Sequence, residues 1–319
     1  MRLKKYLVWV LFVLGTLGAS AQTGVQYEMT VAQDDSGDFT TIQAAVDAIK
    51  AFPDKRITIY IKNGVYLEKI IIPSWNNQLS LIGEDPEKTI VRWDDSFNKI
   101  NRGRNSTFFT YTLKVEADDF YAENLTIENA AGPVGQAVAL HVEGDRVVFK
   151  NCRITGNQDT LYVNGENSRQ YFKACIISGT TDFIFGSATA VFEDCTIISK
   201  KDSYITAAST VEGKVFGLVF IHCNLQAAEG VGQVYLGRPW RPFAKTVFIE
   251  CRLGKHIRAE GWKEWNNADD KSTTYYAEYN NSGEGALTKD RVAWSHRLDD
   301  AEAEKYSAKN ILGDWIDNY

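Results

Sequence analysis

The feature that most constrains the fold of this chain is a short phrase that recurs along its middle part. In each copy a phenylalanine is followed three positions later by a cysteine, and a branched aliphatic residue stands two positions after the cysteine. Five copies are present: Phe149-x-x-Cys152, Phe172-x-x-Cys175, Phe192-x-x-Cys195, Phe220-x-x-Cys223 and Phe248-x-x-Cys251. Tyr121-x-x-Asn124 fits as a sixth copy, with asparagine in the cysteine position. Repetition at 20 to 28 residues is typical of a solenoid.

The composition of each repeat indicates which solenoid this is. Each unit is a short β-branched and aromatic segment bounded by Asn, Asp, Gly and Ser, and no helical period intervenes. This favours an all-β, single-stranded parallel β-helix over a leucine-rich horseshoe. Equivalent residues then stack at the ~4.8 Å spacing of neighbouring strands, so we expect the five cysteines to form a buried ladder of reduced thiols. Disulfides between some neighbours are the alternative.

The two ends of the solenoid need caps. Thr40-x-x-Gln43 predicts a capping box, and the apolar spacing that follows predicts an amphipathic N-terminal capping helix over about 40–50. Strands are predicted at 57–61, 69–72, 79–82 and 89–91, and a terminal helix at 299–312. No Pro/Gly/Ser-rich linker interrupts the chain, so we expect one domain over 22–319.

The N-terminus has the pattern of a secretory signal peptide. Three basic residues lie within the first five positions, an apolar stretch covers 6–17, and Ala19-Ser20-Ala21 offers a small-x-small cleavage site. A membrane anchor is the alternative, but the apolar run is shorter than the ~20 residues of a span. We therefore expect 1–21 to be removed and the mature protein to be exported, to the periplasm or outside the cell, without membrane insertion. We also expect the mature protein to be a monomer.

Charge and motifs exclude several functional classes. The formal net charge of -6 lacks the basic excess typical of a nucleic-acid-binding protein. The histidines, His141, His222, His256 and His296, have no ligand spacing, so we expect no metal site. No Gly-x-Ser-x-Gly elbow of a serine esterase is present.

The repeat places two carboxylates together. Asp159 and Asp182 each lie seven residues after a cysteine, so they should occupy the same position on consecutive coils. The predicted column on this face contains Asp159, Asp182 and Asp202, with Gln158 beside it, and Gln136 joins the column if the five extra residues of the first long coil loop out before it. Two stacked carboxylates cannot both ionise cheaply, which divides them into an acid and a nucleophile or base, and the glutamine amides could donate to an oxyanion. A solvated polar ladder without function is the alternative.

Five segments in order carry a family resemblance. They are GVYLE at 64–68, QAVAL at 136–140, QDTL at 158–161, DFIFG at 182–186 and LGRPW at 236–240. Together they resemble the signature of pectinesterases, the pectin methylesterases of carbohydrate esterase family 8, and the similarity runs from about residue 30 to 286. The resemblance implies a right-handed β-helix with an open cleft, no cofactor, and hydrolysis of the C6 methyl esters of homogalacturonan to pectate and methanol.

The resemblance also implies roles for individual residues. It makes Asp182 the nucleophile, Asp159 the general acid and then base, and Arg238 the partner of the nucleophile. Gln136 and Gln158 become the oxyanion-hole amides. Trp240 becomes a sugar-stacking platform, and Thr112 and Phe185 become substrate contacts. Trp262 and Trp265 either line the cleft or cover the side of the solenoid.

Three rival functions remain at this point. A pectate lyase would share the solenoid but would need a Ca²⁺ carboxylate cluster and a basic residue that abstracts a proton. A non-catalytic binding protein would need no paired acids, and fold alone does not decide function. A relative acting on another ester would keep the catalytic set and change only the cleft loops.

Overall fold

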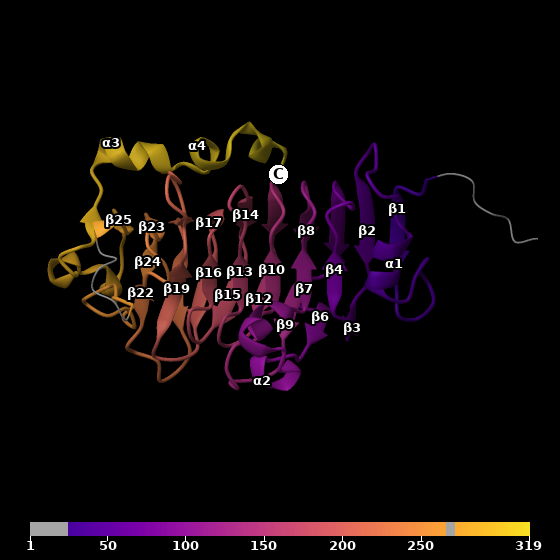
Figure 1. Cartoon of the computed structure of the whole chain (residues 1–319), viewed down its shortest axis with the longest axis horizontal. Helices are drawn as coiled ribbons and strands as arrows, with labels where there is room; N and C mark the ends of the chain where they lie inside the picture. The colour runs from indigo at the N-terminus through magenta and orange to yellow at the C-terminus, as the bar shows by residue number, and fades with distance from the viewer. Residues whose placement is uncertain (1–24, 266–271) are drawn as a thin grey trace, which may run out of the picture.

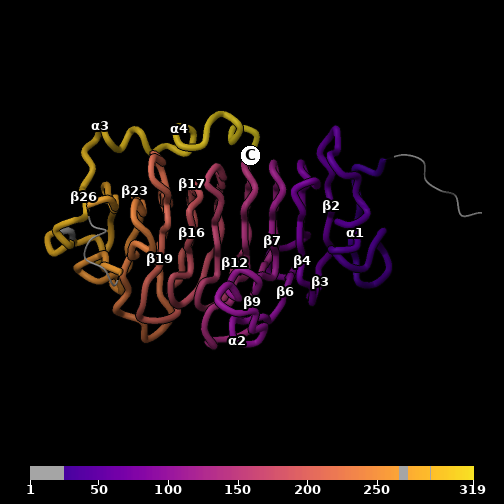
Figure 2. Tube along the Cα trace, viewed as in Figure 1, coloured from indigo at the N-terminus to yellow at the C-terminus, as the bar shows by residue number. Residues whose placement is uncertain are grey.

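The computed structural model describes residues 25–265 and 272–319, so the predicted signal peptide lies outside the described residues. The chain forms an elongated solenoid that advances steadily from one end to the other (Figures 1 and 2). Successive coils add strands to three sheets, and all the strand pairs are parallel. Within the described part of the chain, no helix is long and apolar enough to cross a membrane.

The three sheets run along the whole solenoid. Sheet A contains β1 (Glu28–Val31), β2 (Ile57–Ile61), β5 (Leu79–Gly83), β8 (Tyr121–Glu123), β11 (Val147–Lys150), β14 (Arg169–Lys173), β17 (Thr189–Glu193), β20 (Leu218–Ile221), β23 (Lys245–Ile249), β25 (Tyr275–Tyr279) and β26 (His296–Arg297). Sheet B contains β3 (Gly64–Tyr66), β6 (Thr89–Trp93), β9 (Thr126–Asn129), β12 (Arg153–Thr155), β15 (Ile176–Gly179), β18 (Thr196–Ser199), β21 (Asn224–Ala227) and β24 (Arg252–Leu253). Sheet C contains β4 (Ile70–Ile72), β7 (Leu113–Val115), β10 (Leu140–Val142), β13 (Leu161–Val163), β16 (Ile184–Gly186), β19 (Tyr204–Ala208) and β22 (Tyr235–Gly237). The four early strands predicted from the sequence correspond to β2, β4, β5 and β6.

The repeated phrase marks the turn from sheet A to sheet B. The residue before each cysteine adopts the left-handed conformation, with φ between 49° and 54°. These residues are Asn151, Ala174, Asp194, His222 and Glu250. A single left-handed residue bends the chain sharply, and the cysteine that follows it is buried in the core.

The interior consists of two ladders that the phrase predicted. The five phenylalanines stack with ring centroids 4.4 to 5.3 Å apart from coil to coil. All five cysteines are buried and none forms a disulfide, which confirms the reduced ladder. Each thiol lies near a carbonyl of the preceding coil, as in the 3.3 Å contact from Cys175 Sγ to the oxygen of Phe149. The sixth copy was misaligned by one residue: Ile127 pairs with Ile154, so Leu125 stands in the cysteine position.

The N-terminal capping helix is present, but its cap differs from the prediction. α1 (Ile42–Ala48) begins after Thr41, whose hydroxyl accepts from the backbone N–H of Ala44, so the predicted capping box at Thr40 is wrong. The reason is a contact from outside the helix. The carboxylate of Glu68 accepts the first-turn N–H groups of Ile42 and Gln43, at 2.8 and 2.9 Å. The side chain of Gln43 is therefore free to bond to the next coil. Its side-chain carbonyl oxygen accepts a hydrogen bond from the N–H of Ile71.

The predicted terminal helix is two helices. α3 (Asp300–Ala303) continues into a 3₁₀ turn, η5 (Glu304–Tyr306), and α4 (Ala308–Leu312) begins after Ser307. Ser307 has extended backbone and its hydroxyl accepts from the N–H of Asn310, so it ends one helical run and caps the next. The apolar residues of α4 pack on the outer face of sheet A, against Val191 and Val219. Figure 1 shows this segment running back along the solenoid.

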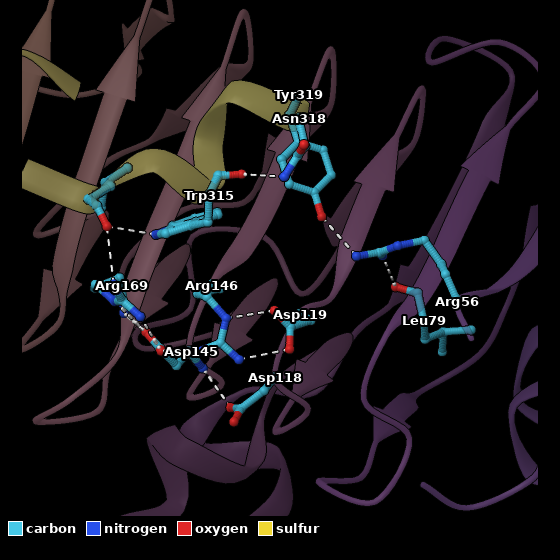
Figure 3. A network of polar contacts seen from close by, with 11 residues as sticks. Arg56, Leu79, Asp118, Asp119, Asp145, Arg146, Arg169, Trp315, Asn318 and Tyr319 are labelled. Carbon is cyan, nitrogen blue, oxygen red and sulfur yellow. Dashed lines mark hydrogen bonds and ion pairs between the residues drawn. The ribbon is translucent and has the colours of Figure 1, made fainter. Parts of the chain in front are cut away.

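The last residues of the chain are clamped to sheet A by polar contacts (Figure 3). Arg169 pairs with Asp145 and donates to the carbonyl of Leu312 at 3.1 Å. Tyr319 stacks on Tyr121 with centroids 5.0 Å apart, and its hydroxyl accepts from Arg56 at 2.8 Å. The returning segment therefore covers one outer sheet and leaves sheet C open.

Candidate active site

Asp159 and Asp182 lie side by side on neighbouring coils, as the repeat predicted. Each stands two residues before a strand of sheet C, and Leu161 of β13 pairs with Ile184 of β16. Both aspartates adopt left-handed backbone, with φ of 63° and 48°, at the turn from sheet B into sheet C. Aspartate tolerates this conformation better than most side chains. Asp159 is 9% exposed and Asp182 is 6% exposed, so both carboxyl groups are largely withdrawn from water.

The rest of the predicted column is wrong in register. Gln136 pairs with Gln158 rather than with Asp159. On the other side, Tyr204 replaces Asp202 as the neighbour of Asp182, because the turn after Cys195 is two residues longer than the turns before it. The carboxylate of Asp202 instead accepts the N–H groups of Gly232 and Gln233, both at 2.8 Å, and these bonds lower its pKa. Asp202 thus anchors a loop.

Arg238 reaches Asp182 from two coils away. It follows β22, which lies next to β19 in sheet C, and β19 lies next to β16. Its Nε and Nη2 atoms donate to the two carboxylate oxygens of Asp182, at 3.0 and 2.7 Å. The guanidinium carbon lies 4.0 Å from the ring centroid of Tyr204 and 3.8 Å from that of Trp265. The two rings hold the guanidinium in the orientation that binds the carboxylate.

The surroundings separate the two carboxyl groups electrostatically. Burial raises the pKa of Asp159 well above its usual range, and the charge of Asp182 raises it further. The charge of Arg238 and, to a smaller extent, a hydrogen bond from Gln158 oppose this rise. Burial also raises the pKa of Asp182, but the bidentate guanidinium of Arg238 opposes that rise. The arrangement favours a protonated Asp159 beside an ionised Asp182.

These groups open into one cleft of about 430 Å³ on the sheet C side. It is lined by Arg104, Asn105, Thr107, Phe108, Gln136, Gln158, Asp159, Asp182, Phe185, Ala207, Arg238, Trp240, Arg241 and Trp265. The structure thus brings together seven of the eight predicted site residues. Phe185 and Trp240 meet edge to face, with centroids 5.9 Å apart.

Thr112 is the exception. Its side chain is fully buried and its hydroxyl donates to the carbonyl of Glu128 at 2.9 Å, so it does not reach the cleft. The two tryptophans left open by the sequence also separate. Trp262 is in the core between Phe248 and Tyr276, whereas Trp265 lines the cleft.

One wall of the cleft was missed by sequence reasoning. The residues that line it come from the 3₁₀ helix η1 (Gly103–Phe109), and α2 (Phe97–Ile100) packs against η1; both stand outside the repeat. Asn129 ties this wall to the segment before β10. Its side-chain nitrogen lies within 2.9 to 3.1 Å of three carbonyl oxygens, those of Asp95, Thr110 and Val138.

The same wall also bonds to the backbone of a cleft residue. The N–H of Phe97 donates to the carbonyl of Gln136 at 2.9 Å. The pair of contacts, through Asn129 and through Phe97, fixes the segment that carries Gln136. Only the run of aromatic residues at 108–111 could have indicated that this wall lies in the cleft.

Comparison with known proteins agrees with this geometry. A family model described as Pectinesterase matches residues 28–314. The chain belongs to the pectinesterase family. It is 38% identical over 281 residues to Pectinesterase 31 from Arabidopsis thaliana, covering 86% of this chain and 88% of that protein. It spans about half the length of several other curated pectinesterases that it matches.

Solved structures of pectin methylesterases share the fold. The enzyme from carrot superposes with a TM-score of 0.86 at 32% identity, covering 94% of this chain and 97% of that one. A pectin methylesterase crystallised in complex with a hexasaccharide superposes with a TM-score of 0.79 at 31% identity, covering 92% and 98%. The right-handed parallel β-helix predicted from the sequence is thereby confirmed.

Proposed function

We propose that this protein is a pectin methylesterase that hydrolyses the C6 methyl esters of homogalacturonan through an aspartyl nucleophile. One observation carries the proposal: a buried carboxylate held by a bidentate arginine lies beside a second carboxyl group of strongly raised pKa, and two glutamines line the same cleft. This set supplies a nucleophile, an acid and oxyanion donors without a metal or a cofactor.

In the first half of the reaction, an oxygen of ionised Asp182 attacks the C6 carbonyl carbon of a methyl-esterified galacturonate. The carbonyl oxygen becomes an oxyanion that accepts hydrogen bonds from the amides of Gln136 and Gln158. The bond from carbon to the methoxy oxygen then breaks, and protonated Asp159 gives its proton to the departing oxygen. Methanol leaves, and an anhydride joins the substrate to Asp182.

In the second half, Asp159 is ionised and acts as a base. It takes a proton from a water molecule as the water oxygen attacks the anhydride carbon. The bond to Asp182 breaks, the free galacturonate carboxylic acid leaves, and both aspartates return to their starting protonation states. One ester and one water thus become one acid and one methanol.

The remaining lining of the cleft supports this choice of substrate. Trp240 lines the cleft with an aromatic ring of the kind on which sugar rings stack, and Phe185 and Trp240 are in T-shaped contact. We also propose that the protein is exported, on the basis of its first 21 residues. We also propose that it acts as a monomer, because the aspartates, the glutamines and the arginine of the proposed reaction meet in one cleft without a residue from a second copy being needed for any step.

Methanol release from methylated pectin tests this proposal against its rivals. The wild-type protein should release methanol, leave the polygalacturonate chain uncut, and need no Ca²⁺. Asp182→Asn should lose nearly all turnover while keeping its fold and much of its affinity for pectin, and Asp159→Asn should be nearly as damaging. Asp202→Asn is the matched control, because this aspartate anchors a loop outside the cleft. Wild-type turnover in folded Asp182→Asn, or cleavage of polygalacturonate, would overturn the proposal.

A further inference from the structure

The phenylalanine ladder of the core is followed by a charged residue near the C-terminal end of the solenoid. Phe248, the last phenylalanine, pairs in register with Glu278 of β25, so Glu278 occupies the inward position of the next coil. The side chains of Glu278 and Arg291 are each 6% exposed, and the two form an ion pair at 2.7 Å. A well-packed apolar pair is often as stable as a buried ion pair. Stability alone therefore does not account for charges at this position.

Every donor of the Arg291 guanidinium is used. Nε and Nη2 donate to the two carboxylate oxygens of Glu278, at 2.7 and 3.2 Å. Nη2 also donates to the carbonyl of Gly285 at 2.7 Å. Nη1 donates to the carbonyls of Arg258 and Ala259, at 3.0 and 2.9 Å. A guanidinium has five N–H donors in one plane, so Arg291 joins three parts of the chain in a fixed geometry.

One of these parts, the segment 258–265, runs beside β22. The N–H of Leu236 donates to the carbonyl of Gly261 at 2.7 Å, and the N–H of Lys263 donates to the carbonyl of Gly237 at 3.1 Å. The pairing is parallel, like that of the strands of sheet C. The segment therefore forms the neighbour of β22 on the side away from β19.

The segment 258–265 reaches Arg238 in two ways. β22 ends at the residue before Arg238, so the backbone pairing fixes the point from which this side chain extends. At the end of the segment, the ring of Trp265 lies 3.8 Å from the guanidinium carbon of Arg238. Arg238 in turn holds both carboxylate oxygens of Asp182. A displacement of the segment would therefore disturb this ion pair.

Gly261 shows how closely the segment rests on Arg291. Its φ is 70°, and a Cβ atom added to it would lie 2.5 Å from the Cδ atom of Arg291. A side chain at this position would push the segment and the arginine apart. The contact thus offers a way to disturb the arrangement without changing any charge.

We propose that Arg291, fixed by Glu278, is a positioning residue that holds the segment 258–265 and, through it, the ion pair between Arg238 and Asp182. This inference rests on the proposed function. Arg291 does not line the cleft, so it acts on the reaction only through the residues that it positions. The five directed hydrogen bonds explain why a charged pair stands where an apolar pair would fill the space.

The main test is the double variant Glu278→Leu/Arg291→Met, which removes both charges together and leaves neither buried alone. The measurement is kcat/KM for methanol release against pH, with folding checked by circular dichroism. We expect kcat/KM to fall by up to about 10²-fold, as for a reacting group displaced by ~1 Å. Asp182 faces Arg238 and Asp159, and a loosened Arg238 opposes the effect of burial less. The pKa of Asp182 should then rise, and activity should be lost at a higher pH than in the wild type.

Two single variants test the same contact from its two sides. Arg291→Lys keeps a charge opposite Glu278 but has fewer donors, so its acid limb should lie between those of the wild type and the double variant. Gly261→Ala changes no charge and should move the acid limb in the same direction. If the double variant does not fold, these two variants decide the question by the same measurement.

The matched control is Arg146→Gln. Arg146 donates to both carboxylate oxygens of Asp119, at 2.6 and 2.8 Å, and neither residue lines the cleft (Figure 3). This variant also breaks a bidentate ion pair, so its melting temperature should fall, whereas its acid limb should coincide with that of the wild type.

The outcomes separate this inference from the proposed function. If the folded double variant or Gly261→Ala keeps the acid limb of the wild type, or if Arg146→Gln moves it equally far, the inference is overturned and the esterase activity stands. If the wild type releases no methanol from methylated pectin, the proposed function itself fails and this inference falls with it.

Discussion

Arg238 binds both carboxylate oxygens of Asp182, one through Nε at 3.0 Å and the other through Nη2 at 2.7 Å, although the two residues lie 56 positions apart. The rings of Tyr204 and Trp265 lie against the guanidinium. The carboxylate is therefore oriented before any substrate arrives. The same contact opposes the effect of burial on the pKa of Asp182, so one arginine both positions this group and keeps it ionised.

Arg238→Gln should move the acid limb of the pH profile. Burial alone would then act on Asp182, so its pKa should rise. Attack requires the ionised form, and activity is lost as the pH falls through this pKa, so the loss should begin at a higher pH than in the wild type. The measurement is kcat/KM against pH. Arg238→Lys should lie between the two because it keeps the charge and loses the bidentate geometry.

The matched control is Arg258→Gln. Arg258 pairs with Glu260 and does not line the cleft. Its acid limb should coincide with that of the wild type. An unchanged acid limb in Arg238→Gln would contradict the role given to this ion pair.

Replacing either glutamine with alanine should lower kcat by roughly 10²-fold or more, the usual cost of one lost oxyanion donor. The two variants should differ in pH dependence. Gln158 donates to Asp159 and lowers its pKa, so Gln158→Ala should raise that pKa further and move the alkaline limb to higher pH. We expect no such shift in Gln136→Ala. If both variants stay within a few-fold of the wild type, neither amide binds the oxyanion.

The repeat predicted those parts of the site that depend on stacking. Because Asp159 and Asp182 each lie seven residues after a cysteine of the repeat, their juxtaposition could be inferred from this spacing alone. The same rule misplaced Asp202, because the turn before β19 is two residues longer than the turns before it. Gln136 was misplaced by one residue because the sixth copy of the phrase, from which it was counted, is itself misaligned by one residue.

Contacts that cross the repeat could not be inferred by stacking at all. Arg238 was assigned through the family resemblance alone, because it spans two coils. Arg104 lies on a wall that has no counterpart in the other coils. Thr112 was placed in the cleft by resemblance, yet the structure turns its hydroxyl toward the carbonyl of Glu128.

Asn129→Ala tests the anchor of the missed wall. Its buried side-chain amide contacts the carbonyls of Asp95 and Thr110, which flank the wall, and the carbonyl of Val138, which precedes β10. Loss of this amide should therefore destabilise the fold by about 1–3 kcal/mol. It should also loosen the segment carrying Gln136. Because that amide is proposed to act on the oxyanion rather than on bound substrate, kcat should fall more than tenfold with little change in KM.

Thr112→Val provides the matched control for Asn129→Ala. It removes the buried hydrogen bond from the Thr112 hydroxyl to the carbonyl of Glu128, and Thr112 does not line the cleft. It should lower stability to a similar degree and leave kcat near the wild-type value. An equal loss of kcat in both variants would mean that Asn129 acts through stability alone.

The cysteine ladder gives a prediction that is independent of catalysis. Cys175 is fully buried among Phe149, Cys152 and Cys195 of the stacked core, and burial raises the pKa of its thiol well above the usual range. Because all five thiols are buried in the stacked core, they should be unreactive in the folded protein, and a reducing agent should leave the melting temperature unchanged. Cys175→Ser should destabilise by about 1–3 kcal/mol, because a hydroxyl is more costly to bury than a thiol in an apolar ladder. Thiol titration of the denatured, unreduced protein should find five free thiols. A count of one or three would show that disulfides link neighbouring coils, and the ladder would then be stabilised by cross-links rather than by packing.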